Sequence, residues 1–330
     1  MEELKIFLQL AVEAKASDLH LVAGAIPVMR VHREIQILGK DVLTNASVQK
    51  IVNALLTQVQ LKELAESGDV DVGSSVGDVN IRVNIHQQSN GLGLAIRLIP
   101  SKIPTPEELL FEDALLEIAD MESGFVVISG PTGSGKSTTM AAIIQAINQR
   151  HARHIVTLED PIEYRFQNDK SLIEQRQLGI NFPSFQFGLR HVLRQDPDVI
   201  VVGEMRDPET ISLALTAAET GHLVISTLHA PNAAEVVERI VNVFEGASQQ
   251  QVLVQLSATL KIVVAQQLLP AKGGGVVAAR EILLSSMAVQ NAIRTNNLPT
   301  IRSAIQTGKK QGMISMAQSM KKLQDEDLIE

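Results

Sequence analysis

The residues most able to do chemistry lie near the middle of the chain and fit the pattern G-x-x-x-x-G-K-[ST]. Glycines at these spacings let the backbone wrap a phosphate with its N–H groups pointing inward, and the dipole of the following helix adds positive charge. The lysine would reach the β- and γ-phosphates, and the serine hydroxyl would bind Mg²⁺. The nucleotide-binding loop is therefore predicted to comprise Gly130, Pro131, Thr132, Gly133, Ser134, Gly135, Lys136, Ser137 and Thr138.

Two groups of acids accompany this loop. Glu204 follows the apolar run 199–202, where a carboxylate could support Mg²⁺ or polarise the attacking water. Glu163 belongs to Asp160-Pro161-Ile162-Glu163, near the end of another predicted strand. That spacing also resembles a helix capping box, which needs no catalysis to explain it. The spacing alone leaves both interpretations of Glu163 open.

Histidines and arginines add further candidates. His222 and His229 flank a predicted strand, and we expect them near one sheet edge, where a γ-phosphate contact or a purely structural role would suit them. Zinc is disfavoured because HExxH is absent and the chain has 0 Cys. Arg82 and Arg97 lie on predicted strands far from the loop; they are either solvated surface residues or arginine fingers acting across a subunit contact.

The elements that must position these residues change character along the chain. Residues 2–15 have the spacing of an amphipathic helix, and short strand-like runs follow around a helical stretch at 47–66, which predicts a small α+β domain. Three prolines near residues 100–106 favour an extended connection. Strands at 125–129, 155–158, 199–202 and 223–226 then alternate with helices, and this predicts a mainly parallel α/β sheet. Residues 262–269 and 276–282 resemble a hairpin, and the tail beyond 287 looks helical.

Composition excludes several classes of protein. The 330 residues carry Lys+Arg 29 against Asp+Glu 37, a net charge of −8, and only 3% aromatic residues, so a general nucleic-acid binder is not expected. The absence of Cys removes disulfides and thiolate zinc sites. The N-terminus lacks the cationic start of a signal peptide, and no apolar run approaches the roughly 20 residues that span a bilayer. We therefore expect a cytoplasmic protein.

Together these motifs resemble the secretion ATPase superfamily, and most closely its type IV pilus retraction (twitching-motility) ATPases. The likeness runs from Ala16-Ser17-Asp18-Leu19-His20 to the C-terminal helices. It covers the Walker A loop, an Asp box at 159–163, a Walker B segment at 198–207 and a His box at 220–229. The resemblance implies that Glu163 and Glu204 are the catalytic acids and that His222 and His229 are the His-box positions.

The resemblance also implies an architecture and partners. A PAS-like domain would occupy 1–98, a Pro-rich linker 99–110, a RecA-like ATPase domain 111–286 and C-terminal helices 287–330. The chain would form a homohexameric ring that binds ATP and Mg²⁺ between its domains, with Arg82 and Arg97 gripping the phosphates. It would dock at the inner membrane on the pilus platform protein, with a paralogous pilus ATPase as a further partner.

One motif departs from the family pattern. The family's retraction signature Ala-Ile-Arg-Asn-Leu-Ile-Arg-Glu falls on residues 288–295, where its first Arg is Gln290 and its closing Glu is Thr295. This leaves pilus extension, type II secretion or an accessory ATP-binding role as alternatives to retraction. The extension and secretion relatives commonly carry extra N-terminal domains and a four-cysteine zinc element, which this chain lacks.

Overall fold

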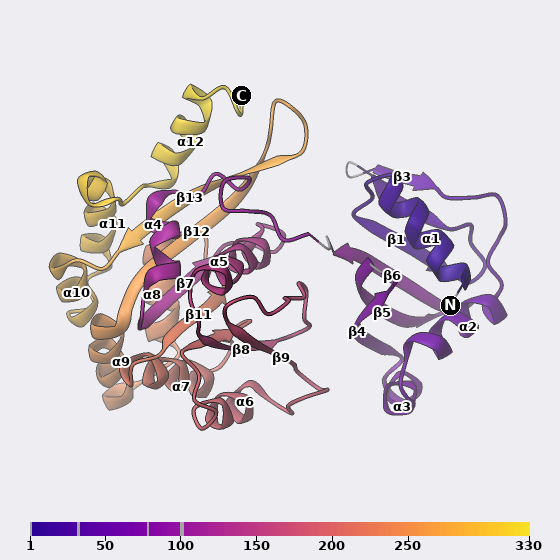
Figure 1. The fold of residues 1–330 in the computed structure, drawn as a ribbon, viewed down its shortest axis with the longest axis horizontal. Coiled ribbons are helices and arrows are strands. Elements are labelled where there is room, and N and C mark those ends of the chain that lie inside the picture. Colours follow the sequence, from indigo (N-terminus) through magenta and orange to yellow (C-terminus); the bar gives the residue numbers. More distant parts are fainter. Residues whose placement is uncertain (1, 32–33, 78, 100–101) are drawn as a thin grey trace. The chain divides into compact units, whose positions relative to one another are not determined.

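The computed structural model describes residues 2–31, 34–77, 79–99 and 102–330, and these form two compact units (Figure 1). The first unit contains the residues up to Lys102 together with Pro161–Arg165, and the second contains Ile103–Asp160 and Phe166–Glu330. Within the predicted linker 99–110, residues 100 and 101 lie outside the described residues, and 103–110 belong to the second unit. The four domain ranges given above stay predictions.

The first unit is an antiparallel sheet with helices against it, in the strand order β3-β2-β1-β6-β5-β4 among the described residues. Buried apolar residues such as Leu19, Leu21, Ile81 and Ile85 alternate along the strands and pack against the helices, as a half-buried sheet requires. The elements are α1 (Glu2–Glu13), β1 (Asp18–Val22), β2 (Val28–Val31), β3 (Glu34–Ile37), α2 (Asn45–Leu55), α3 (Gln58–Ser67), β4 (Asp69–Val76), β5 (Val79–Gln88) and β6 (Gly91–Ile99).

The predicted α+β character of this unit and the helical stretch expected at 47–66 are confirmed, although the stretch is not one continuous helix. Two helices form it, because Leu56 is extended with φ −95° and Thr57 starts a new helix with a capping box. The backbone N–H of Thr57 donates to Gln60 Oε1 at 3.0 Å, while Gln60 N–H donates to Thr57 Oγ1 at 3.4 Å. The Thr-x-x-Gln spacing is a known signature of a helix start.

The second unit is built on a mixed sheet, which runs β13-β12-β7-β11-β10-β8-β9 through the described residues. The strands from β12 to β9 pair in parallel, and only β13 is antiparallel, to β12. The predicted parallel-rich α/β fold and the predicted hairpin are therefore confirmed. The strands are β7 (Gly124–Ser129), β8 (His154–Glu159), β9 (Leu172–Gln177), β10 (Val199–Val202), β11 (Leu223–Leu228), β12 (Leu260–Pro270) and β13 (Val276–Leu284).

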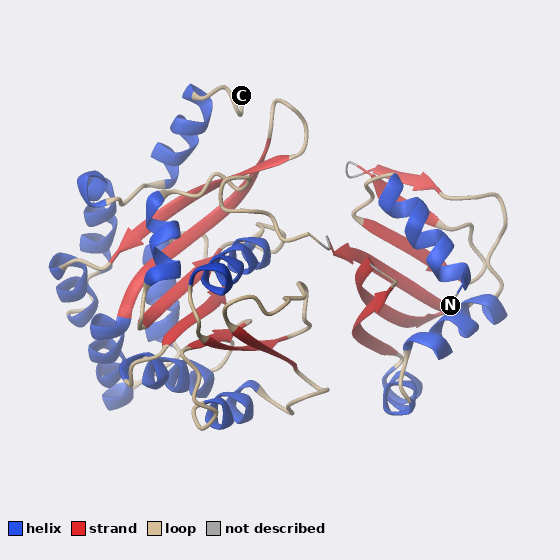
Figure 2. Ribbon diagram, in the orientation of Figure 1, coloured by secondary structure: helices blue, strands red, loops and turns tan. Residues whose placement is uncertain are grey.

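Helices cover both faces of this sheet (Figure 2). Val126 and Ile128 of β7 share a core with α4 and α5, whereas Phe125 and Val127 of the same strand share one with α6 to α11. Burial on both faces explains why these strands are continuously apolar. The helices are α4 (Asp113–Glu117), α5 (Lys136–Arg150), α6 (Phe185–Val192), α7 (Pro208–Glu219), α8 (Ala233–Asn242), α9 (Gly246–Thr259), α10 (Met287–Arg294), α11 (Leu298–Thr307) and α12 (Met316–Asp325), with short 3₁₀ turns at Ile118–Asp120 and Gly308–Gln311.

Two further expectations have clear outcomes. The helical tail beyond 287 is confirmed, and Val289, Ile293 and Ile301 of its helices share one core with the sheet. The capping-box interpretation of Asp160-Pro161-Ile162-Glu163 is wrong, because no helix starts at Asp160. The chain passes from β8 into irregular backbone there, and residues 161–165 group with the first unit.

The start of α7 carries a testable stability prediction. Asp207 accepts hydrogen bonds from Thr210 N–H at 2.9 Å and from Thr210 Oγ1 at 2.6 Å. Asp207→Ala is expected to lower the free energy of unfolding by about 1 kcal/mol at neutral pH, measured by urea denaturation followed by circular dichroism. Asp207→Asn is the matched control, because its amide oxygen still caps the helix. Equal stability of the Ala variant and the unaltered protein would contradict the capping role.

The same carboxylate gives this effect a pH dependence. Burial raises the pKa of Asp207, but the hydrogen bonds from Thr210 outweigh it and hold the pKa below its ordinary value of 3.8. A lowered pKa in the folded state contributes stability above the ordinary pKa, and this contribution disappears as the pH falls through the folded-state pKa. The difference between Asp207→Ala and the unaltered protein should therefore shrink below pH 3.8.

Candidate active site

The predicted nucleotide-binding loop connects β7 to α5. All six residues of β7 are buried, and the loop then turns through Gly130, Gly133 and Gly135 with φ values of 147°, 77° and 84°. A Cβ on Gly130 would lie 2.3 Å from the carbonyl oxygen of Gln266, so this turn accepts no side chain. The loop therefore leads its backbone directly into the N-terminus of α5, where an anion is favoured.

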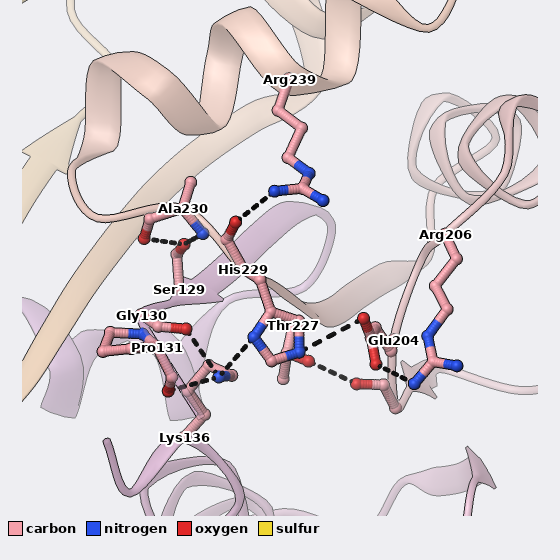
Figure 3. A network of polar contacts seen from close by, with 11 residues as sticks. Ser129, Gly130, Pro131, Lys136, Glu204, Arg206, Thr227, His229, Ala230 and Arg239 are labelled. Carbon is pink, nitrogen blue, oxygen red and sulfur yellow. Dashed lines mark hydrogen bonds and ion pairs between the residues drawn. The ribbon is translucent and has the colours of Figure 1, made fainter. Parts of the chain in front are cut away.

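Lys136 is the first residue of α5, and its ammonium group turns back over the loop (Figure 3). Its Nζ donates to the carbonyl oxygens of Gly130 at 2.8 Å and Pro131 at 3.0 Å, and lies 3.5 Å from Nδ1 of His229. The positive charge is thus held at the mouth of the loop, where the sequence predicts the phosphates.

Glu204 lies at the end of a strand two places along the sheet from β7, with β11 between them. It follows β10 through Gly203, whose N–H donates to the Leu158 carbonyl at the end of β8 at 2.7 Å. One carboxylate oxygen lies 3.3 Å from His229 Nε2, and the other accepts from Arg206 at 2.8 Å. Burial raises the pKa of Glu204, but the hydrogen bond and charge of Arg206, with His229 and Lys136, outweigh burial and hold it below the ordinary value. Glu204 is therefore ionised at neutral pH.

His229 joins the two charged residues. Its Nδ1 faces Lys136 and its Nε2 faces Glu204, so the imidazole bridges cation and carboxylate (Figure 3). Arg239 of α8 donates to the His229 carbonyl at 2.5 Å and holds the backbone in place. Sequence reasoning predicted Lys136, Glu204 and His229 separately, and the structure brings all three together.

The expectation that His222 and His229 share one sheet edge is wrong. His222 precedes β11 and His229 follows it, so an extended strand separates them by about 20 Å. His222 instead lies within hydrogen-bonding distance, 2.9 Å, of the Ala217 carbonyl at the end of α7. Side chains at opposite ends of one strand cannot serve the same phosphate group within one chain.

The other predicted residues belong to the first unit. Arg82 on β5 and Arg97 on β6 are direct cross-strand partners, so the structure brings these two arginines side by side. Arg97 also donates to Asp18 Oδ1 at 3.0 Å. Glu163 falls in the segment 161–165 that groups with the same unit. The catalytic and phosphate-binding roles of these three residues stay predictions.

Sequence reasoning missed two arginines of this site. Arg206 and Arg239 line a cavity of about 480 Å³ beside Glu204 and His229, together with Thr132, Met205, Ile211, Leu228 and Val243. Arg206 lies two residues after Glu204, which is a signal that could have been used. Arg239 lies within an amphipathic helix and gives no such signal. The cavity thus joins the loop residue Thr132 to a carboxylate, an imidazole and two guanidinium groups.

Oxygen donors that suit Mg²⁺ are present in two of the predicted residues. The Ser137 hydroxyl and the Glu204 carboxylate are hard ligands of the type that Mg²⁺ prefers, and this ion is usually held by only one or two protein groups beside substrate phosphates. Across residues 2–31, 34–77, 79–99 and 102–330, no group of three or more His, Asp or Glu residues could hold a metal ion by itself. The residues therefore fit a phosphate-assisted Mg²⁺ site rather than an all-protein one.

A parallel-rich sheet with helices on both faces, whose strand β7 runs through a glycine loop into a lysine-bearing helix, defines a P-loop nucleoside-triphosphatase fold. Residues 2–311 match the family described as type II/IV secretion system protein. The chain therefore belongs to this family. None of the helices in the described part of the chain is long and apolar enough to cross a membrane.

Named relatives match nearly the whole chain. A type IV pilus retraction ATPase, PilT, of Pseudomonas aeruginosa is 42% identical over 323 residues, which is 97% of this chain and 94% of the relative. A twitching motility protein of Neisseria gonorrhoeae is 44% identical, covering 93% of this chain and 83% of the relative. The crystal structure of the pilus retraction motor PilT with bound ADP matches with a TM-score of 0.90 and 41% identity, over 98% of this chain and 93% of that one.

Proposed function

We propose that the protein is an ATP-hydrolysing motor that powers the retraction of type IV pili and thereby twitching motility. The match over 97% of the chain to a pilus retraction ATPase carries this proposal. The arrangement of Lys136, His229 and Glu204 supports the ATPase activity, because it provides the charges that triphosphate cleavage requires.

The chemistry follows from charge placement. The loop amides and Lys136 stabilise the negative charge on the β- and γ-phosphates. Bound Mg²⁺, held by Ser137 and Glu204, would supply further neutralisation of the phosphate oxygens. Glu204 or Glu163 polarises the attacking water, and the lowered pKa of Glu204 keeps its carboxylate ionised at neutral pH. His229 and Arg206 hold the Glu204 carboxylate in one orientation.

The proposed working form is a homohexameric ring in the cytoplasm. Arg82 and Arg97 lie side by side on one face of the first unit, which suits two guanidinium groups gripping one triphosphate. His222 would then act in a different place from His229, because β11 separates them. The ring would dock on the inner-membrane platform protein of the pilus, alongside a paralogous pilus ATPase. The net charge of −8 and 3% aromatic content give no support to a nucleic-acid partner.

The altered retraction segment keeps the fold of its helix. Within α10, Val289 and Ile293 are buried in the core of the second unit. Gln290 donates to Ser285 Oγ at 3.2 Å, and Thr295 donates to the Asn291 carbonyl at 2.8 Å. Both exchanged residues therefore make local hydrogen bonds, and the departure removes surface charge without disturbing the packing.

Deleting the gene and complementing it with Lys136→Ala tests this proposal in the cell. A retraction motor without its phosphate-binding lysine should leave cells with extra pili and no surface movement, scored by electron microscopy and a twitching assay. Complementation with the unaltered gene is the control. Cells without pili would instead indicate an extension motor, and normal pili with normal movement would contradict both roles.

A further inference from the structure

Buried polar side chains form a continuous chain on the far side of the nucleotide-binding loop from Glu204. Gln266 of β12 is 2% exposed and lies directly under the loop. Its Nε2 donates to the Ser134 carbonyl at 2.5 Å, and its Oε1 accepts from Thr139 Oγ1 of α5 at 2.8 Å. The side-chain amide of Gln266 is therefore hydrogen-bonded both to the backbone of the loop and to the first turn of the helix that follows it.

Arg280 continues this chain away from the loop. It is the direct cross-strand partner of Gln266 on β13, is 1% exposed, and donates from Nε to Gln266 Oε1 at 3.2 Å. Its two terminal nitrogens donate to the carbonyls of Leu109 at 2.9 Å and Leu110 at 3.2 Å, and to Glu112 Oε2 at 3.2 Å. The guanidinium group thus holds Gln266 with one end and the segment 109–112 with the other.

The segment 109–112 is unusual in its backbone. Leu110 has φ 51°, a left-handed conformation that costs a non-glycine residue free energy. Glu112 is the N-cap of α4, yet its side chain makes no capping hydrogen bond and pairs with Arg280 instead. The Phe111 ring centroid lies 5.1 Å from Arg280 Cζ. Arg280 therefore contacts four successive residues, 109–112, and helps to hold this strained segment in place.

Arg280 holds the strained turn at Leu110 together with backbone hydrogen bonds, which the N–H groups of Leu110 and Phe111 donate to the carbonyls of residues 107 and 106 at 3.1 and 2.9 Å. If the Arg280 hydrogen bonds rearrange, the left-handed turn at Leu110 can relax to an ordinary conformation. This turn lies where the chain enters the second unit, immediately after the proline-rich stretch. A small shift in the loop can therefore become a larger change in the direction of the connection.

We propose that Gln266 and Arg280 are positioning residues that relay the nucleotide state of the loop to residues 109–112 and thereby set the angle between the two units. The relay rests on the nucleotide binding of the proposed function. ATP contacts at Ser134 and the first turn of α5 displace Gln266, and Arg280 transmits this displacement to the carbonyls of Leu109 and Leu110. Neither Gln266 nor Arg280 belongs to the predicted nucleotide-binding loop 130–138, so both act through the residues they contact.

Energy transfer between dyes on the two units tests the relay in the full-length chain. Because the protein has 0 Cys, Glu66→Cys on α3 and Lys321→Cys on α12 create two unique labelling sites at exposed positions. Arg280→Lys keeps a charge for Glu112 but lacks the forked donors for Leu109 and Leu110. It should reduce the ATP-induced shift between the two states by between about 2-fold and about 30-fold, with ATP affinity close to that of the unaltered protein.

Two further variants make the result decisive. Glu112→Gln removes the charge partner of Arg280 and should cause the same loss of response. It keeps the relay testable if Arg280→Lys does not fold. Arg302→Lys, an exposed arginine of the same unit, is the matched control and should respond fully. A purely structural role would lower ATP affinity together with the response, whereas the relay lowers the response at unchanged ATP affinity.

The outcomes separate the relay from the proposed function. Full ATP responses in both Arg280→Lys and Glu112→Gln would overturn the relay while ATPase activity stands. ATP binding without any change in energy transfer in the unaltered protein would overturn it as well. Absence of ATP binding by the unaltered protein would overturn the proposed function and the relay together.

Discussion

Glu204→Gln is expected to lower ATP turnover by about 10²-fold to about 10⁴-fold while ATP affinity stays close to that of the unaltered protein. The amide keeps the size of the side chain and still accepts a hydrogen bond from Arg206, so the cavity keeps its shape. It loses the negative charge that accepts a proton from water and supports Mg²⁺. Steady-state phosphate release measures turnover, and calorimetric titration with a non-hydrolysable ATP analogue measures affinity.

Controls identify the reason for the loss. Glu219→Gln on α7 is the matched variant, because this exposed glutamate lies at the other end of the sheet and should keep normal turnover. If Glu204 acts mainly through Mg²⁺, raising the Mg²⁺ concentration should restore part of the activity of Glu204→Gln. If Glu204 is the base, added Mg²⁺ should have no effect. Normal turnover in Glu204→Gln would contradict both roles.

Much of the second unit follows from local sequence signals. The glycine loop needs φ values that few other residues adopt, and Asp207-Pro208 specifies both the cap and the first residue of α7. Strands buried on both faces must be apolar throughout, so β7 and β10 are recognisable without any alignment. These signals predict which elements exist and place the carboxyl ends of parallel strands at one edge.

Contacts between distant parts of the chain have no such signal. Asp160-Pro161-Ile162-Glu163 has the spacing of a capping box, but this segment leaves β8 as irregular backbone and groups with the first unit. The position of Arg239 depends on which face of α8 meets the His229 carbonyl, and the sequence shows only that the helix is amphipathic. The separation of His222 from His229 follows from the length and direction of β11, so closeness in sequence was a poor guide.

The connection between Arg280 and the nucleotide-binding loop is the strongest example of a contact that no local sequence signal predicts. Arg280 meets Gln266 only because β12 and β13 pair in one register, and it meets Leu109 only because the chain returns after 171 residues. A buried arginine on a strand reads as an exception to the apolar pattern, and burial pulls its pKa down against the opposing charge of Glu112. The role of such a buried charged residue can be inferred only when the structure shows its hydrogen-bond and ion-pair partners.

Lys136→Ala is expected to weaken ATP binding and to lower turnover by at least about 10²-fold, because it removes the cation nearest to the predicted phosphates. In the structure the lysine Nζ is held by two loop carbonyls and lies 3.5 Å from His229, which places its positive charge at the loop mouth. The alanine variant keeps the α5 helix intact, since alanine is the best helix former. The loss should therefore be electrostatic rather than structural.

Three measurements distinguish this loss from unfolding. Circular dichroism and thermal denaturation of Lys136→Ala should match the unaltered protein, while phosphate release falls. Lys309→Ala, an exposed lysine in the C-terminal region, should keep full activity. Because the missing interaction is a charge on a phosphate, the remaining ATP affinity should also depend less on salt concentration than that of the unaltered protein. Turnover of Lys136→Ala equal to that of Lys309→Ala would show that phosphate cleavage occurs elsewhere in the molecule.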